Sequence, residues 1–502
     1  MQPPDERFGG HEYERRWWTL GVLCLSLLTI VIANASLNVA LPTLAGSLHA
    51  SPSSLQWIVD AYALVFAGLL LTAGSLGDRY GRRGALNIGL VIFGNASGLA
   101  VFANSASQLI AARATMGVGA ALVMPATLSI LADVFPPAER RRAIAIWAGF
   151  AGIGLALGGV ISGWMLEHSW WGSIFVLNVV VVTVALVAGA FLVPRAADDH
   201  EPALDPAGAV LSILGLGSLI YAIIEAPTHG WLAADTLFGF AVAFAVLAGF
   251  AAWELHADEP MLDLRFFANR QFTAATTSIT LMFFASFGMI FILTQYLQLV
   301  LGLSPLGAGV RLLPWAAMFM VVAPRSARLV ERFGYRTIVT SGLTIAAGGL
   351  GLLAMNGIHA NEALLALSLI VVAGGMGMVT APSTGAIIAS LPLNKAGVGS
   401  AVNDTTRELG GALGVAVIGS VLVSIYRDGL PASAGPARES LSAALQQRPA
   451  LADAARHAFV HAFSLTLLVV VGVTVLASAA VHSLLRSPPD TAAATDEAAV
   501  AA

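Results

Sequence analysis

Charged residues are scarce in this 502-residue chain, and their scarcity excludes an ordinary water-soluble fold. Only 11% of the residues are charged, whereas 57% are hydrophobic, and the mean hydropathy is +0.81. An ordinary soluble domain carries about 25% charged residues. A soluble core of this length cannot hide so much apolar surface, so lipid must be the solvent for much of the chain.

Two other residue types are nearly absent. Cys24 is the only cysteine, which excludes a disulfide or a cysteine-based metal site within one chain. Lys395 is the only lysine and follows Asn394, so the chain has no Gly-Lys-Ser/Thr loop for nucleotide phosphates. We therefore expect no nucleotide partner and no ATPase drive. The net charge of −4 gives no indication of a nucleic-acid partner.

Long apolar runs dominate the remainder of the sequence. A bilayer core of about 30 Å requires about 20 apolar residues per helix. The polar breaks between the runs predict fourteen transmembrane helices in an all-α polytopic membrane protein. We expect these helices at residues 17–41, 55–76, 84–103, 108–132, 143–166, 173–193, 207–226, 235–254, 272–299, 306–327, 336–356, 362–390, 398–425 and 459–484.

The basic residues indicate how the chain is oriented in the membrane. Most of the 25 lysines and arginines fall in segments that are cytoplasmic if both termini are cytoplasmic, as the positive-inside rule requires. The arginines of the long outer loop 426–458 are the exception. We therefore expect a multi-pass protein of the inner (cytoplasmic) cell membrane with both termini in the cytoplasm.

The chain also contains an internal repeat. Residues 78–83 (Asp-Arg-Tyr-Gly-Arg-Arg) follow the second span, and residues 331–336 (Glu-Arg-Phe-Gly-Tyr-Arg) follow the tenth. Gly117 and Pro125 have the same spacing as Gly374 and Pro382 at nearly the same offset. Duplicated halves of this kind are typical of rocking transporters whose site lies between the halves. The expected domains are a cytoplasmic tail 1–16, a six-helix bundle 17–193, a linker with two inserted transmembrane helices 194–271, a second bundle 272–484 that includes loop 426–458, and a disordered cytoplasmic tail 485–502.

Residues 74–83 (Gly-Ser-Leu-Gly-Asp-Arg-Tyr-Gly-Arg-Arg) and 109–119 carry a resemblance to a known family. Over about residues 17–485 the chain resembles the fourteen-span drug:proton antiporters (EmrB/QacA type) of the major facilitator superfamily. This resemblance implies the major facilitator fold, with two six-helix bundles and two inserted helices. It also implies a cytoplasmic gate in the first of these loops, whereas the alternative is a static topology anchor. The gate residues would be Gly77, Asp78, Arg79, Gly81, Arg82 and Arg83.

The fourth and fifth spans carry two further matches. Arg113 lies within an apolar helix, where a charge must face polar partners or water. The resemblance implies a proton-relay role for Arg113, and the alternative is a structural hydrogen-bond hub. The fifth span resembles the antiporter motif Gly-Pro-x-x-Gly-Gly, with Gly at the usual Pro and Ser at one usual Gly. Small residues let helices pack closely, and those of this helix are Gly154, Gly158, Gly159 and Gly163.

A few acids within spans are candidates for proton coupling, because a proton carrier must exchange its proton in a low-dielectric medium. Asp60 lies near the start of the second span. Asp404 and Glu408 share one face of the thirteenth span with Arg407 as their charge partner, and interacting acids titrate together. The alternative is an ordinary ion pair near a helix end. Where the family typically has an Asp in the first span, this chain has Ala33, which argues against cationic substrates.

Polar and aromatic side chains in three spans suggest a substrate cavity. Flexible and polarizable side chains suit variable apolar ligands, although packing in the membrane is the alternative. The candidate cavity residues are Asn34, Asn38, Trp57, Phe284, Phe287, Gln295 and Tyr296.

The function that these residues favour is secondary active export. We expect small, largely apolar drugs or toxic natural products to leave by proton antiport and alternating access. The alternative is a proton-coupled or facilitative transporter of an endogenous metabolite in the same fold. The chain lacks Gly-x-Ser-x-Gly and His-Glu-x-x-His, so we expect no enzyme, no catalytic or metal residues, and no cofactor beyond the proton gradient. We expect the monomer to be the functional unit.

Overall fold

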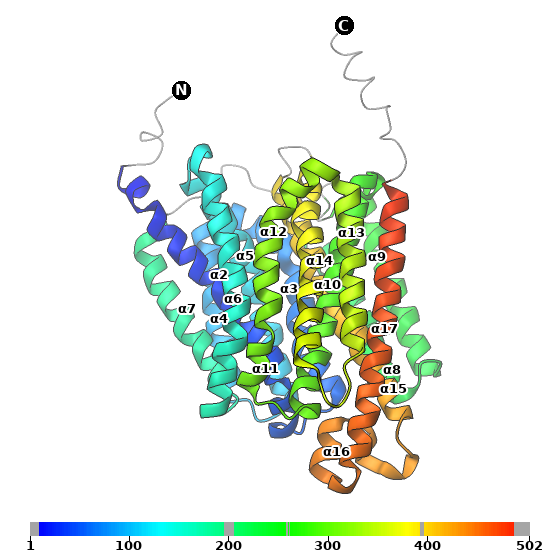
Figure 1. Ribbon diagram of the computed structural model, residues 1–502. Coiled ribbons are helices and arrows are strands. Elements are labelled where there is room, and N and C mark those ends of the chain that lie inside the picture. Colours follow the sequence, from blue (N-terminus) through cyan, green and yellow to red (C-terminus); the bar gives the residue numbers. More distant parts are fainter. Residues whose placement is uncertain (1–9, 195–204, 258–259, 261, 392–395, 486–502) are drawn as a thin grey trace.

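The computed structural model describes residues 10–194, 205–257, 260, 262–391 and 396–485 (Figure 1). These residues form helices joined by short connections, with no strand among them. The predicted disordered tail after residue 485 lies outside the described ranges, as do residues 1–9. The start of the first described helix, α2 (Gly10–Ser47), and the end of the last, α17 (Ala452–Leu484), lie at the same end of the helices (Figure 1), which we call the terminal side. The opposite end carries α16 (Leu441–Gln447), and we call it the α16 side.

The helices follow the predicted order. The first bundle comprises α2 (Gly10–Ser47), α3 (Pro52–Tyr80), α4 (Arg82–Val101), α5 (Ala106–Val134), α6 (Pro137–His168) and α7 (Ser173–Leu192). The inserted hairpin comprises α8 (Pro206–His229) and α9 (Ala234–His256). After η1 (Leu264–Ala268), the second bundle comprises α10 (Arg270–Gln295), its π-helical extension η2 (Tyr296–Val300), α11 (Pro305–Arg311), α12 (Leu313–Phe333), α13 (Tyr335–Ala354), α14 (Glu362–Ala389), α15 (Ala396–Asp428) and α17 (Ala452–Leu484).

Capping residues lie at the start of several of these helices. Ser51 accepts a hydrogen bond from the Ser54 backbone N–H at 3.1 Å, and Pro52 supplies the fixed φ that suits a first helical position. Ser105 caps α5 in the same way. Asn361 caps α14 by accepting from two backbone N–H groups.

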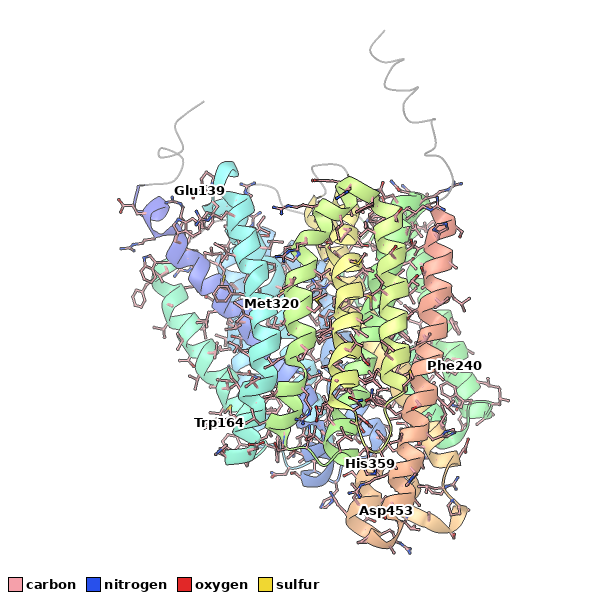
Figure 2. All side chains as sticks on the ribbon, viewed as in Figure 1. Glu139, Trp164, Phe240, Met320, His359 and Asp453 are labelled. Atoms are coloured by element: carbon pink, nitrogen blue, oxygen red, sulfur yellow. The ribbon has the colours of Figure 1, made fainter. Side chains whose placement is uncertain are left out.

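Thirteen helices in the described part of the chain are long and apolar enough to cross a membrane. The helix α6, with 32 residues, is not one of the thirteen but packs against α2 within the first bundle. The prediction of a polytopic membrane protein is therefore confirmed, and the count of fourteen spans stays a prediction. Figure 2 agrees with a lipid-facing surface, because the labelled Met320 is exposed along the helices while Glu139, His359 and Asp453 lie toward their ends.

The internal repeat has a structural counterpart. Gly81 (φ 101°) separates α3 from α4, and Gly334 (φ 81°) separates α12 from α13, in a backbone conformation that side chains other than glycine rarely adopt. The helix pair that follows each turn is also built alike. Gly89 and Gly119 bring α4 and α5 into backbone contact. Gly342 and Gly375 do the same for α13 and α14.

The two bundles meet along a central interface, and the inserted hairpin lies beside it. The main contacts across the interface are those of α3 with α15 and of α6 with α11. The helix α8 packs against α9 and also contacts both α3 and α15. The hairpin therefore covers one side of the junction between the bundles.

Two segments differ from the sequence prediction. The predicted span 306–327 is broken at Leu312 into α11 and α12, because Pro314 lacks the N–H that a continuous helix requires and crowds the preceding turn. Residues 426–458, predicted as a loop, are largely helical and contain η4 (Ala432–Arg438), α16 and η5 (Pro449–Leu451), with α17 starting at Ala452. Buried alanines and Leu441 pack this segment together, and the Tyr426 hydroxyl donates to the Ala437 carbonyl at 2.8 Å.

Candidate functional site

Arg113 lies at the centre of the first bundle, where the apolar helix α5 carries it among polar partners. Its side chain is 1% exposed. Its Nε donates to the Ile58 carbonyl at 3.1 Å, and its Nη2 donates to Asn34 Oδ1 at 2.9 Å. The guanidinium also lies 4.3 Å from the centre of the Tyr62 ring, within range of a cation–π interaction. Arg113 therefore connects α2, α3 and α5, and its Nη1 has no hydrogen-bond partner among the described residues.

The charge on Arg113 also interacts with a charged group of the second bundle. Glu408 of α15 and Arg113 of α5 act electrostatically on one another, and Glu408 also acts on Tyr62. Glu408 is partly exposed although it lies about three turns inside its helix. The face of α15 that carries Glu408 is therefore turned toward the opposite bundle.

Asp404, Arg407 and Glu408 form one charged cluster, as predicted from their spacing. Arg407 Nη1 lies 3.6 Å from Asp404 Oδ1, and their side chains are 35% and 20% exposed. Asn403 Nδ2 donates to Asp404 Oδ1 at 3.1 Å, and the Arg407 guanidinium lies 4.7 Å from the centre of the Phe283 ring. Since the ion pair is long and partly exposed, it binds Asp404 weakly and leaves it available for other partners.

Asp60 lies apart from this cluster, on α3. Its side chain is fully buried, and neither carboxylate oxygen has a hydrogen-bond partner in the described part of the chain. One turn earlier, Gln56 Nε2 donates to the carbonyls of Val415 and Ala416 on α15 at 3.3 and 3.1 Å. Asp60 therefore lies on the helix that contacts the second bundle, close to the point of contact.

A small cavity of ≈70 Å³ lies between the bundles. Its wall is mainly apolar, with the amides of two asparagines and one indole as its polar groups. The Trp315 Nε1 donor is buried without a partner among the described residues. A pocket for a drug-sized ligand measures about 300–1,000 Å³, so this cavity must widen to hold one. The lining residues are Asn34, Ala35, Asn38, Val59, Gly159, Phe287, Ile290, Gly309, Leu312, Trp315, Ala316 and Val415.

The other predicted cavity residues lie elsewhere. The Trp57 ring packs beside Tyr221 of the inserted hairpin at 6.3 Å between ring centres. Phe284 contacts the close-packed α10–α15 seam through its backbone at Gly414. Gln295 donates within its own helix to Phe291 at 3.2 Å. Tyr296 is buried inside the second bundle, where its ring stacks on Phe463 at 4.7 Å and its hydroxyl donates to the Gly357 carbonyl.

Glycines of α6 close the α16 side of the interface. Gly154 and Gly158 face α2, where a Cβ atom on Gly158 would lie 2.7 Å from the Ala35 Cβ. Gly159 and Gly163 face α11 of the other bundle, and a Cβ atom on Gly163 would lie 2.6 Å from the Leu306 Cα. The predicted small-residue helix therefore packs on both bundles at once.

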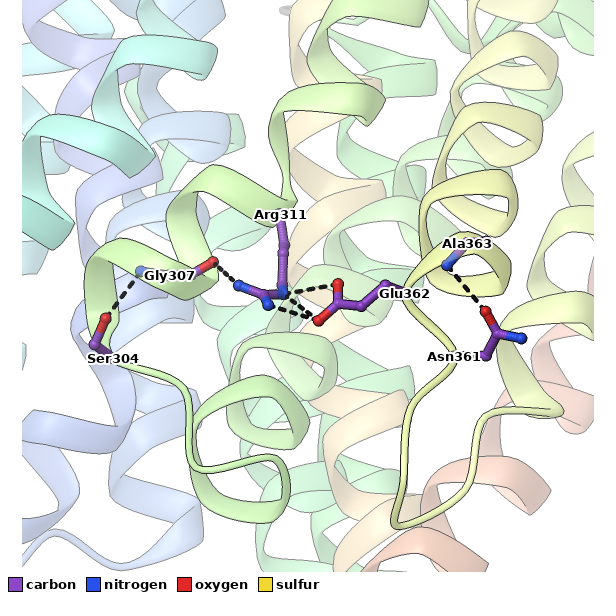
Figure 3. Close-up of polar contacts among 6 residues, drawn as sticks. All are labelled: Ser304, Gly307, Arg311, Asn361, Glu362 and Ala363. Carbon is purple, nitrogen blue, oxygen red and sulfur yellow. Dashed lines mark hydrogen bonds and ion pairs between the residues drawn. The ribbon is translucent and has the colours of Figure 1, made fainter.

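The short helix α11 is fastened from two directions. From the first bundle, Glu167 Oε1 accepts a hydrogen bond from the Leu306 backbone N–H at 3.1 Å. Within the second bundle, Arg311 binds Glu362 through two nitrogens, with Nη2 at 2.6 Å from Oε1 and Nε at 3.0 Å from Oε2 (Figure 3). Arg311 Nη1 also donates to the Gly307 carbonyl at 3.2 Å. The helix is thereby held at the contact between the bundles.

The predicted gate, around the turn of residues 78–83, lies on the terminal side. Gly77 is buried, and Gly81 makes the turn between α3 and α4. Arg82 forms an ion pair with Asp133 of α5, and Arg83 Nη2 donates to the Ala190 carbonyl of α7 at 2.7 Å. The side chains of Asp78 and Arg79 lie outside the described residues, so their predicted roles stay predictions.

Comparison with known proteins identifies the family. The model of the Major Facilitator Superfamily matches residues 23–415. The chain belongs to this superfamily. It is 38% identical over 483 residues to the multidrug efflux pump LfrA of Mycolicibacterium smegmatis, in a match that covers 93% of this chain and 95% of LfrA. It is 34% identical over 489 residues to the methyl viologen resistance protein SmvA of Salmonella typhimurium, in a match that covers 90% of this chain and 95% of SmvA.

Further relatives and solved structures agree with this assignment. The tetracenomycin C resistance and export protein of Streptomyces glaucescens is 32% identical, in a match that covers 83% of this chain and 78% of the relative. A bacterial homologue of the human lysosomal transporter Spinster, solved in an inward-facing conformation, has a TM-score of 0.67 at 18% identity and covers 94% of this chain and 97% of the homologue. The predicted major facilitator fold is therefore confirmed, and the chain is a multi-pass membrane protein of a transporter family.

Sequence patterns do not single out several residues of this major facilitator site. Gln56 and Trp315 lie in no motif, and both take part through the packing of the two bundles. Trp315 directly follows Pro314 in an apolar run, where an aromatic residue gives no local signal of a cavity. Tyr62 lies two residues after Asp60, and only the structure shows that its ring lies against Arg113.

Proposed function

We propose that this superfamily member exports small, largely apolar drugs or toxic natural products in exchange for protons. The observation that carries the proposal is the pairing of an apolar cavity between the bundles with titratable groups on α3 and α15, the helices that supply Val59 and Val415 to its wall. The cavity supplies a binding surface for apolar molecules. Asp60, Glu408 and Asp404 supply the groups that can take up a proton, and the names of LfrA and the tetracenomycin C exporter support export as the direction.

The cavity wall favours uncharged substrates over cations. Its polar groups are the amides of Asn34 and Asn38 and the Trp315 indole, and no carboxylate belongs to the lining described above. Ala33, at the position where related transporters usually have an Asp, is buried and adds no charge. A cation entering this cavity would lose its hydration without gaining an ion pair, which is costly. A polar metabolite would face the same apolar wall, which argues against the alternative of metabolite transport.

The transport cycle that we propose is alternating access. The α16 side is closed by the contact of α6 with α11, so the substrate enters the widened cavity from the terminal side. As the substrate leaves the cavity, a proton arriving from the opposite side is taken up by the acids of α3 and α15, and the protonated protein returns to the starting state. Glu408 is suited to transmit this event, because its charge acts on Arg113 across the interface.

We further propose the location and assembly that the sequence predicts. Both termini lie in the cytoplasm and the protein lies in the inner cell membrane, which the arginines of the terminal side support. Residues 17–193 and 272–484 act as the two moving bundles, and the monomer works without a cofactor other than the proton gradient.

The proposal is tested in everted membrane vesicles with an imposed pH gradient. Efflux of an uncharged apolar dye is compared between wild type, Asp60→Asn and the double variant Asp404→Asn with Glu408→Gln. Asp235→Asn, in the exposed first turn of α9, is the matched control. We expect gradient-driven transport to fall at least tenfold in one of the two test variants, while downhill exchange without a gradient is retained. Full gradient-driven transport in both variants would exclude these acids as the coupling sites.

A further inference from the structure

A second pair of acids lies in the inserted hairpin, away from the proposed transport site. Asp205 immediately precedes α8, and Glu254 lies in the last turn of α9. The turn between α8 and α9 contacts the end of α15, where Trp231 Nε1 donates to Ser424 Oγ at 3.1 Å. The acid pair is therefore at the opposite end of the hairpin, on the terminal side.

Asp205 already has donors for its carboxylate. Its Oδ1 accepts from the Gly208 backbone N–H at 2.8 Å and caps the start of α8. The Trp253 indole Nε1 donates to both Asp205 oxygens, at 3.0 and 3.2 Å. In each of these bonds an N–H group donates and an Asp205 oxygen accepts.

Glu254 is different, because it is 2% exposed and only one of its oxygens has a partner. Its Oε2 accepts from the Leu262 backbone N–H at 2.8 Å, whereas Oε1 has no hydrogen-bond partner in the described part of the chain. The free Oε1 faces Asp205. A Cβ atom on Gly208 would lie 2.6 Å from Glu254 Oε1 and 2.4 Å from Asp205 Oδ2, so both oxygens border the same point.

The charges around Glu254 are negative. Asp205 at the start of α8 and Asp263 at the start of η1 both act on Glu254. Arg265 of η1 and His256 of α9 lie nearby in the chain, and the charged groups that act most on Glu254 are the two acids Asp205 and Asp263. Two carboxylates whose oxygens border the same point in a buried site with little water cannot both stay charged.

We propose that Asp205 and Glu254 together bind one proton, which fastens the terminal end of the inserted hairpin. The proton resides on Glu254 Oε1, and this O–H donates to Asp205 Oδ2, so that the pair carries one negative charge in place of two. A proton fits the site better than a metal ion does. The neighbours of the pair are mostly N–H donors, whereas a hard cation requires several additional oxygen ligands.

The bound proton links the hairpin to the second bundle. Glu254 Oε2 accepts the hydrogen bond from the Leu262 N–H. Leu262 lies two residues before η1, and η1 leads into α10. Loss of the proton places two charges side by side and favours separation of Glu254 from Asp205. The hairpin then loosens from the segment that precedes α10, which makes this pair a sensor of pH on the terminal side.

The proposal is tested on the purified full-length protein by infrared spectroscopy and hydrogen exchange. Glu254→Gln keeps the size of the protonated side chain and removes the titration, and Asp205→Asn is a second variant that retains a capping side chain. Glu225→Gln, in α8 toward the other end of the hairpin, is the matched control. We expect wild type to show carboxylic-acid C=O absorption at neutral pH that disappears at alkaline pH, and we expect Glu254→Gln to lose the part of this absorption that one carboxyl group contributes.

Hydrogen exchange measures how often the terminal end of the hairpin opens. If opening follows loss of one proton, the opening equilibrium near Leu262 should rise about tenfold per pH unit after correction for intrinsic exchange. Glu254→Gln should abolish this pH dependence, and Glu225→Gln should retain it.

Unchanged C=O absorption in Glu254→Gln, or the same pH dependence in that variant as in wild type, would overturn the proposal. Protection that follows sodium or potassium concentration at constant pH would also overturn it, in favour of a cation site. Drug export need not change in any of these experiments, so they are independent of the proposed function.

Discussion

Gly163 is a position where a single methyl group should alter the balance between the two access states. Its α-carbon faces the backbone of α11 on the α16 side. A Cβ atom there would lie 2.6 Å from Leu306 Cα, 2.7 Å from the Pro305 carbonyl oxygen and 2.8 Å from the Leu306 nitrogen. These neighbours are backbone atoms, so no side-chain rotation can relieve the clash. The methyl group that Gly163→Ala adds therefore fits only when α6 and α11 move apart on the α16 side.

The expected size of the effect follows from the cost of overpacking. Inserting a methylene into a well-packed contact costs about 1–3 kcal/mol. The cost applies only to the state in which α6 touches α11, so the equilibrium should shift about 5- to 150-fold toward the state open on the α16 side. Alanine also stabilises a helix by about 0.5–1 kcal/mol relative to glycine. That gain is the same in both states, so it raises stability without changing their ratio.

The shift can be measured by electron-electron resonance between spin labels on the α16 side. Labels at Ser169 and Met355, both exposed, report the separation of the two bundles in a Cys24→Ala background. Gly348→Ala in α13 is the matched control, because a Cβ atom there meets no other atom within 4 Å. We expect a longer-distance population to grow in Gly163→Ala and to remain unchanged in Gly348→Ala. Equal distance distributions in the two variants would refute the closing role of this contact.

Three further predictions concern single contacts. Glu362→Gln should lower the free energy of unfolding by less than about 1 kcal/mol in thermal denaturation, because the Glu362 side chain of its ion pair with Arg311 is 62% exposed; a larger loss would mean that α11 depends on this pair. Trp315→Phe should raise the KM of substrates that carry a hydrogen-bond acceptor about fivefold and leave purely apolar substrates unaffected, because only the indole N–H is removed. Glu139 precedes the predicted span 143–166, and the hydrogen bond from Arg16 lowers the pKa of its carboxyl below the ordinary value of 4.5. The stabilisation of the folded state by this carboxylate is therefore present above pH 4.5 and is lost as the pH falls through the lowered pKa. Hydrogen exchange at the start of α6 should accelerate at acid pH in wild type. Glu139→Gln should lose this pH dependence.

The fold was largely predictable because lipid imposes a simple rule on sequence. Each helix that crosses a bilayer needs an apolar run of known length, and polar breaks between the runs locate the turns. The repeat was readable for a similar reason. Gly81 and Gly334 both adopt positive φ, which favours glycine strongly, so the duplicated turn keeps its residue type.

The site was less predictable, because its decisive contacts join residues far apart in the chain. Arg113 was recognisable as a buried charge, but its partners Asn34 and Ile58 come from two other helices. Gln56 contacts Ala416 of α15, 360 residues later, and no local pattern indicates such a contact. The break at Leu312 had a local signal in Pro314, but proline also occurs inside continuous helices here, as it does within α5. A helix break therefore depends on the packing around the proline as well as on its presence.

Two of the interactions between the bundles differ in their dependence on pH, and this difference explains how a proton could drive transport. The contacts of Gly159 and Gly163 with α11 are steric and independent of pH. The attraction between Arg113 and Glu408 is electrostatic, and it weakens when Glu408 becomes neutral. A proton on Glu408 therefore weakens its attraction to Arg113 and leaves the steric contacts of Gly159 and Gly163 intact until the bundles rock. A ligand shifts an equilibrium only by its differential affinity for the two states, so coupling requires that the Arg113–Glu408 attraction differ between them. Glu408→Gln should then uncouple the access equilibrium from pH in the same spin-label experiment, while Gly163→Ala should shift the equilibrium equally at every pH.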